Sequence, residues 1–148
     1  MVPKNLTDER GTLGSLLRRP YEALVGEVYG SLTSEEFPDL RPAHGVVLRY
    51  ILPNGMRTTE LARCADVTKQ SMAALVEDMR SRGYVDLQPD PTDGRAKLVR
   101  LTKKGERAQE AAARISREVE ARWSALVGVR EWTAMRATLE KLGEILER

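Results

Sequence analysis

The sequence contains one cysteine and one histidine, and this scarcity excludes several classes of function. A lone cysteine, Cys64, cannot form an intrachain disulfide, so we expect a protein of the reducing cytoplasm. One cysteine and one histidine are too few for a zinc-binding cluster, and the HExxH, GxxxxGK[ST] and GxSxG motifs are absent. The sequence therefore predicts no metal centre, no cofactor and no enzymatic activity.

Long hydrophobic runs are also missing. No stretch free of Asp, Glu, Lys and Arg exceeds seven residues, so we expect neither a transmembrane helix nor a signal peptide. The 148 residues, 41% of them hydrophobic and 31% charged, have the composition of one globular domain. A chain of this length can bury a core without a disulfide or a metal.

The net charge of +2 hides an asymmetry along the chain. Residues 80–107 contain eight basic and four acidic residues, which makes this window +4 and leaves −2 for the other 120 residues. Such a segment predicts either a site for a polyanion or a solvated charged face. The basic residues are Arg80, Arg82, Arg95, Lys97, Arg100, Lys103, Lys104 and Arg107.

The middle of the chain, residues 42–102, begins with helical patterns. A short helix over about 42–52 follows the linker SEEFPDLRP, and TTELARCADV predicts a second one, capped by Thr58 or Thr59. The third segment, TKQSMAALVEDMRSRGYV, has apolar residues at helical spacing and ends at Gly83, where a C-terminal glycine is typical.

After Gly83 the hydrophobic period changes to that of strands. Val85 and Leu87 alternate with polar residues, PDPTDG supplies turn residues, and RAKLVRL predicts the returning strand. Helix, turn, helix and hairpin in this order predict a winged helix-turn-helix. The expected fold class is therefore mainly α with a small β-hairpin wing.

Helical patterns flank this region at residues 7–36 and 103–148, and Pro20 predicts a kink or a new helix in the first of them. The last helix has a narrow apolar seam of Trp132, Met135, Leu139, Leu142 and Leu146. These stripes exceed what a winged helix of about 60 residues can cover, so we expect dimerisation helices that join two copies of the chain. An intramolecular bundle is the alternative.

The start of the third helix carries unusual residues. Thr68 suits an N-cap, but Lys69, Gln70 and Ser71 follow it where the helix dipole favours acidic side chains. In a helix-turn-helix this end meets the base edges, where Lys69 can contact phosphate or guanine, Gln70 adenine and Ser71 either. A helix that merely tolerates polar residues is the alternative interpretation.

The wing supplies the second set of candidates. Arg95 follows Asp93 and Gly94 at the predicted tip, where an arginine can enter a narrow minor groove. Asp93 cannot attract DNA, and we expect it to pair with Arg95 or to cap the turn. Lys97 is a candidate phosphate contact.

The segments ELARCADVTKQSMAALVEDMRSRGYV and DPTDGRAKLVRLTKKG resemble the recognition helix and wing of MarR-type transcriptional regulators. The resemblance implies a homodimer whose two winged domains read a pseudo-palindromic operator. It also implies a repressor that a small aromatic or phenolic ligand releases from double-stranded DNA. It carries over Thr68 to Ser71 and Asp93 with Arg95, but no ligand site. The alternative is a winged helix that serves only as a protein-interaction module.

Four further residues allow two interpretations each. We interpret Cys64 as a small core residue rather than a redox sensor, since redox-sensing members of the family carry their cysteine in the N-terminal helix. His44, near the start of the helix over 42–52, is expected to be a surface or capping residue rather than a phosphate contact. Trp123 and Trp132 lie at core spacing, which favours packing over a ligand pocket.

Overall fold

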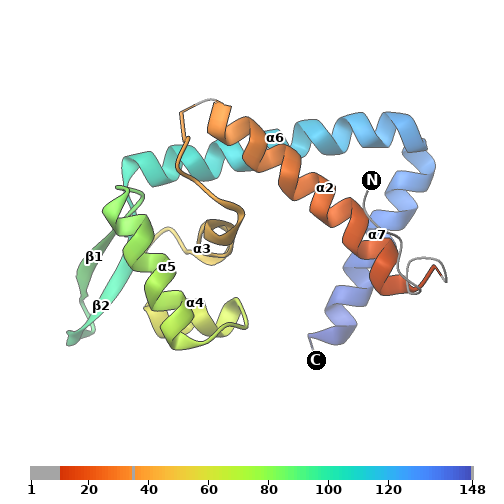
Figure 1. The fold of residues 1–148 in the computed structure, drawn as a ribbon. Helices are drawn as coiled ribbons and strands as arrows, with labels where there is room; N and C mark the ends of the chain where they lie inside the picture. The colour runs from red at the N-terminus through yellow and green to blue at the C-terminus, as the bar shows by residue number, and fades with distance from the viewer. Residues whose placement is uncertain (1–10, 35, 148) are drawn as a thin grey trace.

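The computed structural model describes residues 11–34 and 36–147, and in that part of the chain it is mainly helical with one β-hairpin (Figure 1). The expected fold class is confirmed. Residues 7–10 and 35 of the predicted dimerisation helix 7–36 lie outside the described residues. The elements are α2 (Leu13–Ser34), the 3-10 helix η1 (Pro42–His44), α3 (Gly45–Tyr50), α4 (Thr58–Cys64), α5 (Lys69–Ser81), β1 (Val85–Asp90), β2 (Asp93–Leu101), α6 (Lys103–Val127) and α7 (Val129–Leu146).

Two long helices form the upper part of the molecule in Figure 1, where α2 crosses α6 and α7 folds back from the far end of α6. The short helices α3, α4 and α5 and the hairpin lie below the first half of α6. No helix among residues 11–34 and 36–147 is long and apolar enough to cross a membrane.

Helices α4 and α5 are joined by a tight turn in which Asp66 has a positive φ of 52°. The turn ends at Thr68, whose hydroxyl accepts the Ser71 backbone N–H at 3.1 Å and caps α5. At the other end of α5, Gly83 adopts a φ of 82°, and the Tyr84 N–H returns to the Met79 carbonyl at 2.9 Å. This glycine-based helix end directs the chain into β1, as the sequence predicted.

The wing is an antiparallel hairpin whose register runs from Val85 opposite Leu101 to Pro89 opposite Lys97. The register then shifts, so that Asp90 faces Asp93 and residues 94–96 have no partner on β1. The turn is therefore shorter than PDPTDG, and Arg95 lies in an irregular part of β2 just after the tip. Met56 pairs with Val99 on the other edge of β2 and ties the base of the wing to the segment before α4.

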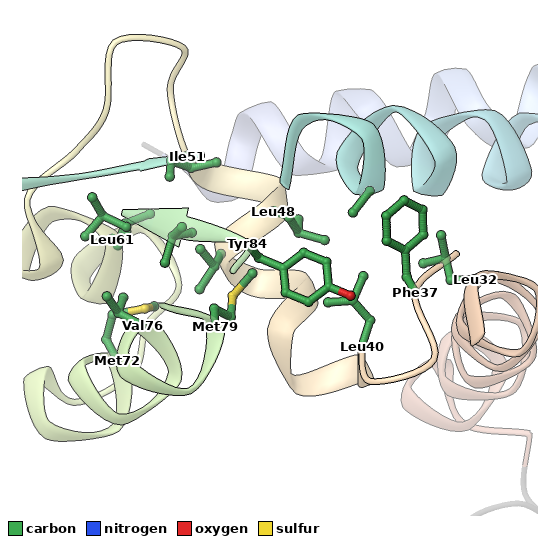
Figure 2. Packing of buried hydrophobic residues seen from close by; sticks show 14 of the residues in the cluster. Leu32, Phe37, Leu40, Leu48, Ile51, Leu61, Met72, Val76, Met79 and Tyr84 are labelled. Carbon is green, nitrogen blue, oxygen red and sulfur yellow. The ribbon is translucent and has the colours of Figure 1, made fainter. Parts of the chain in front are cut away.

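The core lies where the second half of α2 meets α3, α4, α5, the base of the hairpin and the first half of α6 (Figure 2). Tyr84 is fully buried at its centre, and its ring lies 6.2 Å from that of Phe37. Other fully buried members are Leu32, Val47, Leu61, Met72, Met79, Val85, Val99 and Ala108. One continuous core thus unites the winged helix with the two helices above it.

Gly105 lies where the start of α6 passes close to the backbone of Tyr84. Thr102 caps α6 by accepting the Gly105 N–H at 3.1 Å, and the Thr102 N–H donates to the Tyr84 carbonyl at 3.0 Å. A Cβ on Gly105 would fall deep inside van der Waals contact of the Tyr84 carbonyl oxygen and 3.1 Å from its carbon. Glycine is therefore needed here for close approach of two backbones.

Helix structure differs from expectation at two points. Of the two alternatives at Pro20, a new helix is excluded, because α2 continues through the proline from Leu13 to Ser34, and the kink stays a prediction. Proline cannot donate its backbone hydrogen bond, but the helix continues because apolar residues before and after Pro20 lie on the same face of α2. Helix α4 is capped by neither Thr58 nor Thr59: Arg57 is its N-cap residue, and its N–H donates to the Glu60 carboxylate at 3.1 Å.

The expectation that Cys64 is a core residue is also wrong, because this cysteine is exposed. Helix α4 buries Leu61 and Ala62 and packs Ala65 against the core. Cys64 lies at the edge of that stripe, on the solvent side.

The far ends of α2 and α6 and all of α7 leave a large apolar surface exposed. Helix α7 has no buried residue among those described, and Leu126 at the end of α6 is 84% exposed. An apolar groove of about 830 Å³ lies between the three helices, and Trp123 and Trp132 form part of its wall. The exposed apolar residues include Leu13, Leu16, Leu17, Val127, Val129, Met135, Leu139, Leu142, Ile145 and Leu146.

Candidate nucleic-acid interface

The first turn of α5 presents Lys69 and Gln70 to solvent. The side chains of Thr68 and Ser71 are hydrogen-bonded to each other: the Thr68 hydroxyl donates to Ser71 Oγ at 2.9 Å and also caps the helix by accepting the Ser71 N–H. Among the described residues, neither Lys69 nor Gln70 has a side-chain partner. This leaves a cation and an amide free at the positive end of a helix, next to backbone N–H groups that can bind anions.

The wing presents a second pair of unpartnered side chains. Arg95 and Lys97 are both exposed, and within residues 11–34 and 36–147 neither side chain forms a hydrogen bond or ion pair. The Asp93 carboxylate instead bonds to the backbone of the turn, since its Oδ1 accepts the Arg95 N–H at 3.1 Å. Of the two roles expected for Asp93, the geometry therefore favours the cap over an ion pair with the Arg95 side chain.

The other cations of the basic window are engaged in contacts within the chain. Arg82 pairs with Asp78, Lys104 donates to the Arg82 carbonyl, and Arg107 lies 3.5 Å from Glu36. Arg80 forms an ion pair with Glu77, and Lys103 forms one with Glu106. Arg100 donates a hydrogen bond to the Gln88 side chain. Six of the eight cations thus have a partner within the described part of the chain, and the two without one, Arg95 and Lys97, lie on the wing.

An ion pair that the sequence does not reveal fixes the wing to the first helix of the helix-turn-helix. Arg57 Nε and Nη2 donate to Asp90 Oδ2 at 2.8 and 2.7 Å, and Asp90 is buried. The other carboxylate oxygen accepts the Thr92 N–H at 2.8 Å and its hydroxyl at 2.7 Å. We name Arg57, Asp90 and Thr92 the wing clamp. Its partners are 33 residues apart, so no local pattern could have identified it.

The wing clamp is expected to make stability depend on pH. The two hydrogen bonds from Thr92, followed by the Arg57 guanidinium, lower the pKa of Asp90 from 3.8 to about 2. A depressed pKa gives stabilisation that is complete above about pH 4 and lost as the pH falls through about 2. We therefore expect Asp90→Asn to melt below the wild type at neutral pH, and this gap to narrow toward pH 2, in thermal unfolding followed by circular dichroism.

Asp86→Asn is the matched control, because Asp86 is an exposed carboxylate on the same strand. Its melting temperature should follow that of the wild type across the pH series. An Asp90→Asn gap of equal size at neutral pH and at about pH 2 would contradict the clamp.

A cavity of about 270 Å³ lies between α2, α3 and α6, where the terminal helices meet the winged helix. Its wall is largely apolar but includes Tyr21, Tyr29, Arg49 and Gln109. Burial raises the pKa of Tyr29, so this phenol stays neutral. The sequence offered no motif for this cavity, because its wall comes from three helices that are far apart along the chain.

Comparison with known proteins identifies the family. The family model of the MarR family matches residues 39–96, which contain the winged helix. The chain is 36% identical over 69 residues to the transcriptional activatory protein BadR of Rhodopseudomonas palustris, which covers 47% of this chain and 39% of that protein. The chain spans between 39% and 64% of the length of the curated relatives that it matches.

Solved structures match over almost the whole chain. The Mycobacterium tuberculosis MarR family protein Rv2887, in complex with salicylic acid, is 30% identical with a TM-score of 0.66, and the match covers 88% of this chain and 96% of that one. The transcriptional repressor CouR, bound to a 23-mer DNA duplex, shares the fold with a TM-score of 0.74 at 22% identity, covering 95% and 99%. With this fold and this similarity to Rv2887 along its length, the chain belongs to the MarR family.

Proposed function

We propose that the protein is a sequence-specific DNA-binding transcriptional regulator, acts as a homodimer in the cytoplasm and has no catalytic activity. The observation that carries the proposal is the pair of free polar groups at α5 and on the wing. Lys69, Gln70, Arg95 and Lys97 are exposed and have no side-chain partner in the described part of the chain. In Figure 1 the hairpin tip and α4 lie on the side of the molecule away from α6, where a duplex can approach.

The two sets of residues suit different parts of a duplex. In this proposal α5 enters the major groove, where Gln70 can bond adenine at two points and Lys69 can bond guanine or phosphate. Thr68 and Ser71 hold the first turn in shape, and Ser71 can also reach the bases. Arg95 enters the adjacent minor groove, Lys97 contacts phosphate, and Asp93 orients the wing through the Arg95 backbone.

The exposed apolar surface of α2 and α7 supports the homodimer. A helix with no buried residue of its own, such as α7, needs a partner to cover its apolar seam. Helices 7–36 and 103–148 are therefore proposed as the dimerisation region and residues 42–102 as the DNA-binding region. The two copies of α5 would then lie about one helical turn of DNA apart, roughly 34–36 Å.

We further propose that the regulator is a repressor that a small aromatic or phenolic ligand releases. CouR is a repressor and BadR an activatory protein, so the relatives alone leave the direction open. The cavity between α2, α3 and α6 suits such a ligand, since phenols, an amide and a guanidinium surround apolar walls. A ligand that prefers a dimer with another α5 spacing lowers DNA affinity by its difference in binding free energy.

Fluorescence anisotropy with the duplex upstream of the protein's own reading frame, against a scrambled duplex, tests the DNA proposal. We expect a preference for the native duplex and affinity that falls steeply with salt. Gln70→Ala should reduce the preference by about 1–3 kcal/mol, whereas Lys97→Ala should weaken binding to both duplexes and reduce the salt slope by about 1.

Arg130→Ala is the control, because it removes an exposed cation from α7, which follows the end of α6 that lies away from the wing in Figure 1. Equal weak binding to both duplexes would call for selection from a genomic DNA pool. An absence of binding even at low salt would refute the proposal and favour a protein-interaction module.

A further inference from the structure

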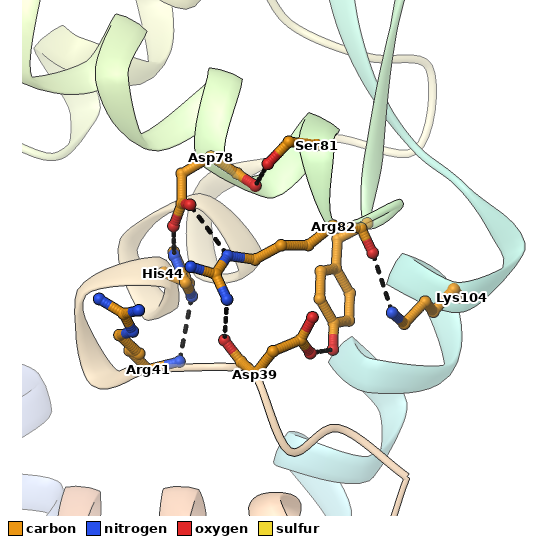
Figure 3. Close-up of polar contacts among 8 residues, drawn as sticks. Asp39, Arg41, His44, Asp78, Ser81, Arg82 and Lys104 are labelled. Atoms are coloured by element: carbon orange, nitrogen blue, oxygen red, sulfur yellow. Dashed lines mark hydrogen bonds and ion pairs between the residues drawn. The ribbon is translucent and has the colours of Figure 1, made fainter.

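His44, expected at the surface, is buried, with 2% of its side chain exposed. Its ring makes two hydrogen bonds at once (Figure 3): Nδ1 accepts the Arg41 N–H at 3.0 Å, and Nε2 lies 2.6 Å from Asp78 Oδ2. A backbone N–H can only donate, so Nδ1 carries no proton and Nε2–H donates to Asp78. The capping role expected for His44 is therefore present, together with a link to α5.

The link belongs to a set of polar contacts between α5 and the segment that follows α2. Asp78 also accepts from Arg82 Nε at 2.9 Å, and Arg82 Nη1 donates to the Asp39 carbonyl at 3.2 Å. The hydrogen bonds from His44 and Arg82 lower the pKa of Asp78, which keeps this acceptor ionised. Close by, the Tyr84 hydroxyl donates to Asp39 Oδ1 at 2.5 Å.

These polar contacts give α5 a directional restraint that its apolar packing does not provide. The helix is held to the core by Met72, Val76 and Met79, and apolar packing is non-directional. Hydrogen bonds depend on angle as well as distance, so they restrict the rotation of a helix about its own axis. Asp78 stands eight residues after Gln70, about 12 Å along the helix, so a small rotation at Asp78 is carried to the DNA-facing end.

We propose that His44 is a positioning residue for DNA recognition: through Asp78 it sets the rotation of α5 and hence the direction in which Lys69 and Gln70 point. This inference rests on the proposed function. His44 itself touches no base or phosphate. His44 lies in η1 and Asp78 in α5, so their hydrogen bond joins the recognition helix α5 to the segment that follows α2.

Two substitutions separate the two hydrogen bonds of His44. In His44→Asn the amide oxygen can take the place of Nδ1 and accept the Arg41 N–H, but nothing reaches Asp78. In His44→Gln the terminal NH₂ can take the place of Nε2 and donate to Asp78, but the Arg41 N–H loses its acceptor. Each variant loses one hydrogen bond, so urea unfolding should show similar losses of stability.

The native-to-scrambled affinity ratio of the two variants is the decisive readout. We expect it to fall by about tenfold or more in His44→Asn, and to stay within about threefold of the wild type in His44→Gln. A merely structural role would change the ratio equally in both variants, and that result would overturn the proposal. If His44→Asn does not fold, Asp78→Ser removes the same link from a side chain that is 38% exposed.

A second readout needs no DNA. The methyl groups of the methionines, labelled with carbon-13, report on α5 through Met72 and Met79, with Met56 and Met135 as internal controls. We expect the Met72 and Met79 signals to shift or broaden in His44→Asn and to remain near their wild-type positions in His44→Gln. If the wild type binds neither duplex even at low salt, the proposed function fails. Unchanged Met72 and Met79 signals in His44→Asn would refute the positioning role separately.

Discussion

Replacing Gly105 by alanine is expected to lower the free energy of unfolding by about 3 kcal/mol, which for a chain of this size is a fall of about 6–12 °C in melting temperature. The added methyl group would overlap the Tyr84 carbonyl and lie 3.0 Å from a Leu101 methyl carbon. Neither neighbour can move freely, because the Tyr84 carbonyl accepts the Thr102 N–H and the Tyr84 ring is fully buried. The hairpin and α6 would have to separate.

Gly30→Ala is the control, since a methyl group there meets nothing within 4 Å. Alanine at this exposed helical position should leave stability unchanged or raise it by about 0.5–1 kcal/mol. Thermal and urea unfolding of both variants decide the matter. A Gly105→Ala protein as stable as the wild type would show that the junction between the hairpin and α6 can open without cost.

In the proposed homodimer, Leu139→Lys is expected to separate the two chains and to reduce operator affinity by about 10²–10⁴-fold. Leu139 is 42% exposed in one chain and lies on the apolar seam of α7. A lysine buried at a dimer interface without a partner charge is strongly unfavourable. A single chain reads only one half-site, so it loses the gain that two linked binding sites provide.

Sedimentation equilibrium measures the first effect and anisotropy with the native duplex the second. Lys141→Glu is the matched control, because it also changes a charge on α7, at an exposed position about half a turn from Leu139. It should leave mass and affinity near those of the wild type. A Leu139→Lys protein that still sediments as two chains at micromolar concentration would show that this seam is not the interface.

The fold could be predicted where short-range rules decide the structure. The helical pattern expected from residue 103 onward begins there as α6, because the cap supplied by Thr102 and the helical spacing are both local features. The end of α5 followed from Gly83 for the same reason. Elsewhere the prediction was wrong because long-range contacts decide the structure. Arg57 is the N-cap residue of α4, although two threonines follow it, and its guanidinium donates to Asp90.

The candidate site divides in the same way. Exposure of Lys69, Gln70 and Arg95 could be expected from their position at a helix start and a hairpin tip, and their contacts with DNA stay a prediction. The position of His44 could not be predicted, because its hydrogen-bond partner Asp78 lies 34 residues away on another helix. The wing clamp and the cavity at Arg49 likewise join segments that only the folded chain brings together.

The register shift in the wing has a consequence for the solubility of the protein. Residues 94–96 have no partner on β1, and apart from the Arg95 N–H, which donates to Asp93, their backbone groups can pair with another strand. Such strand edges promote aggregation. Arg95 and Lys97 place two positive charges along this edge and would repel the same edge of another molecule. Variants that remove both charges are therefore better made with glutamine than with valine or isoleucine, so that weaker DNA binding is not confused with loss of protein from solution.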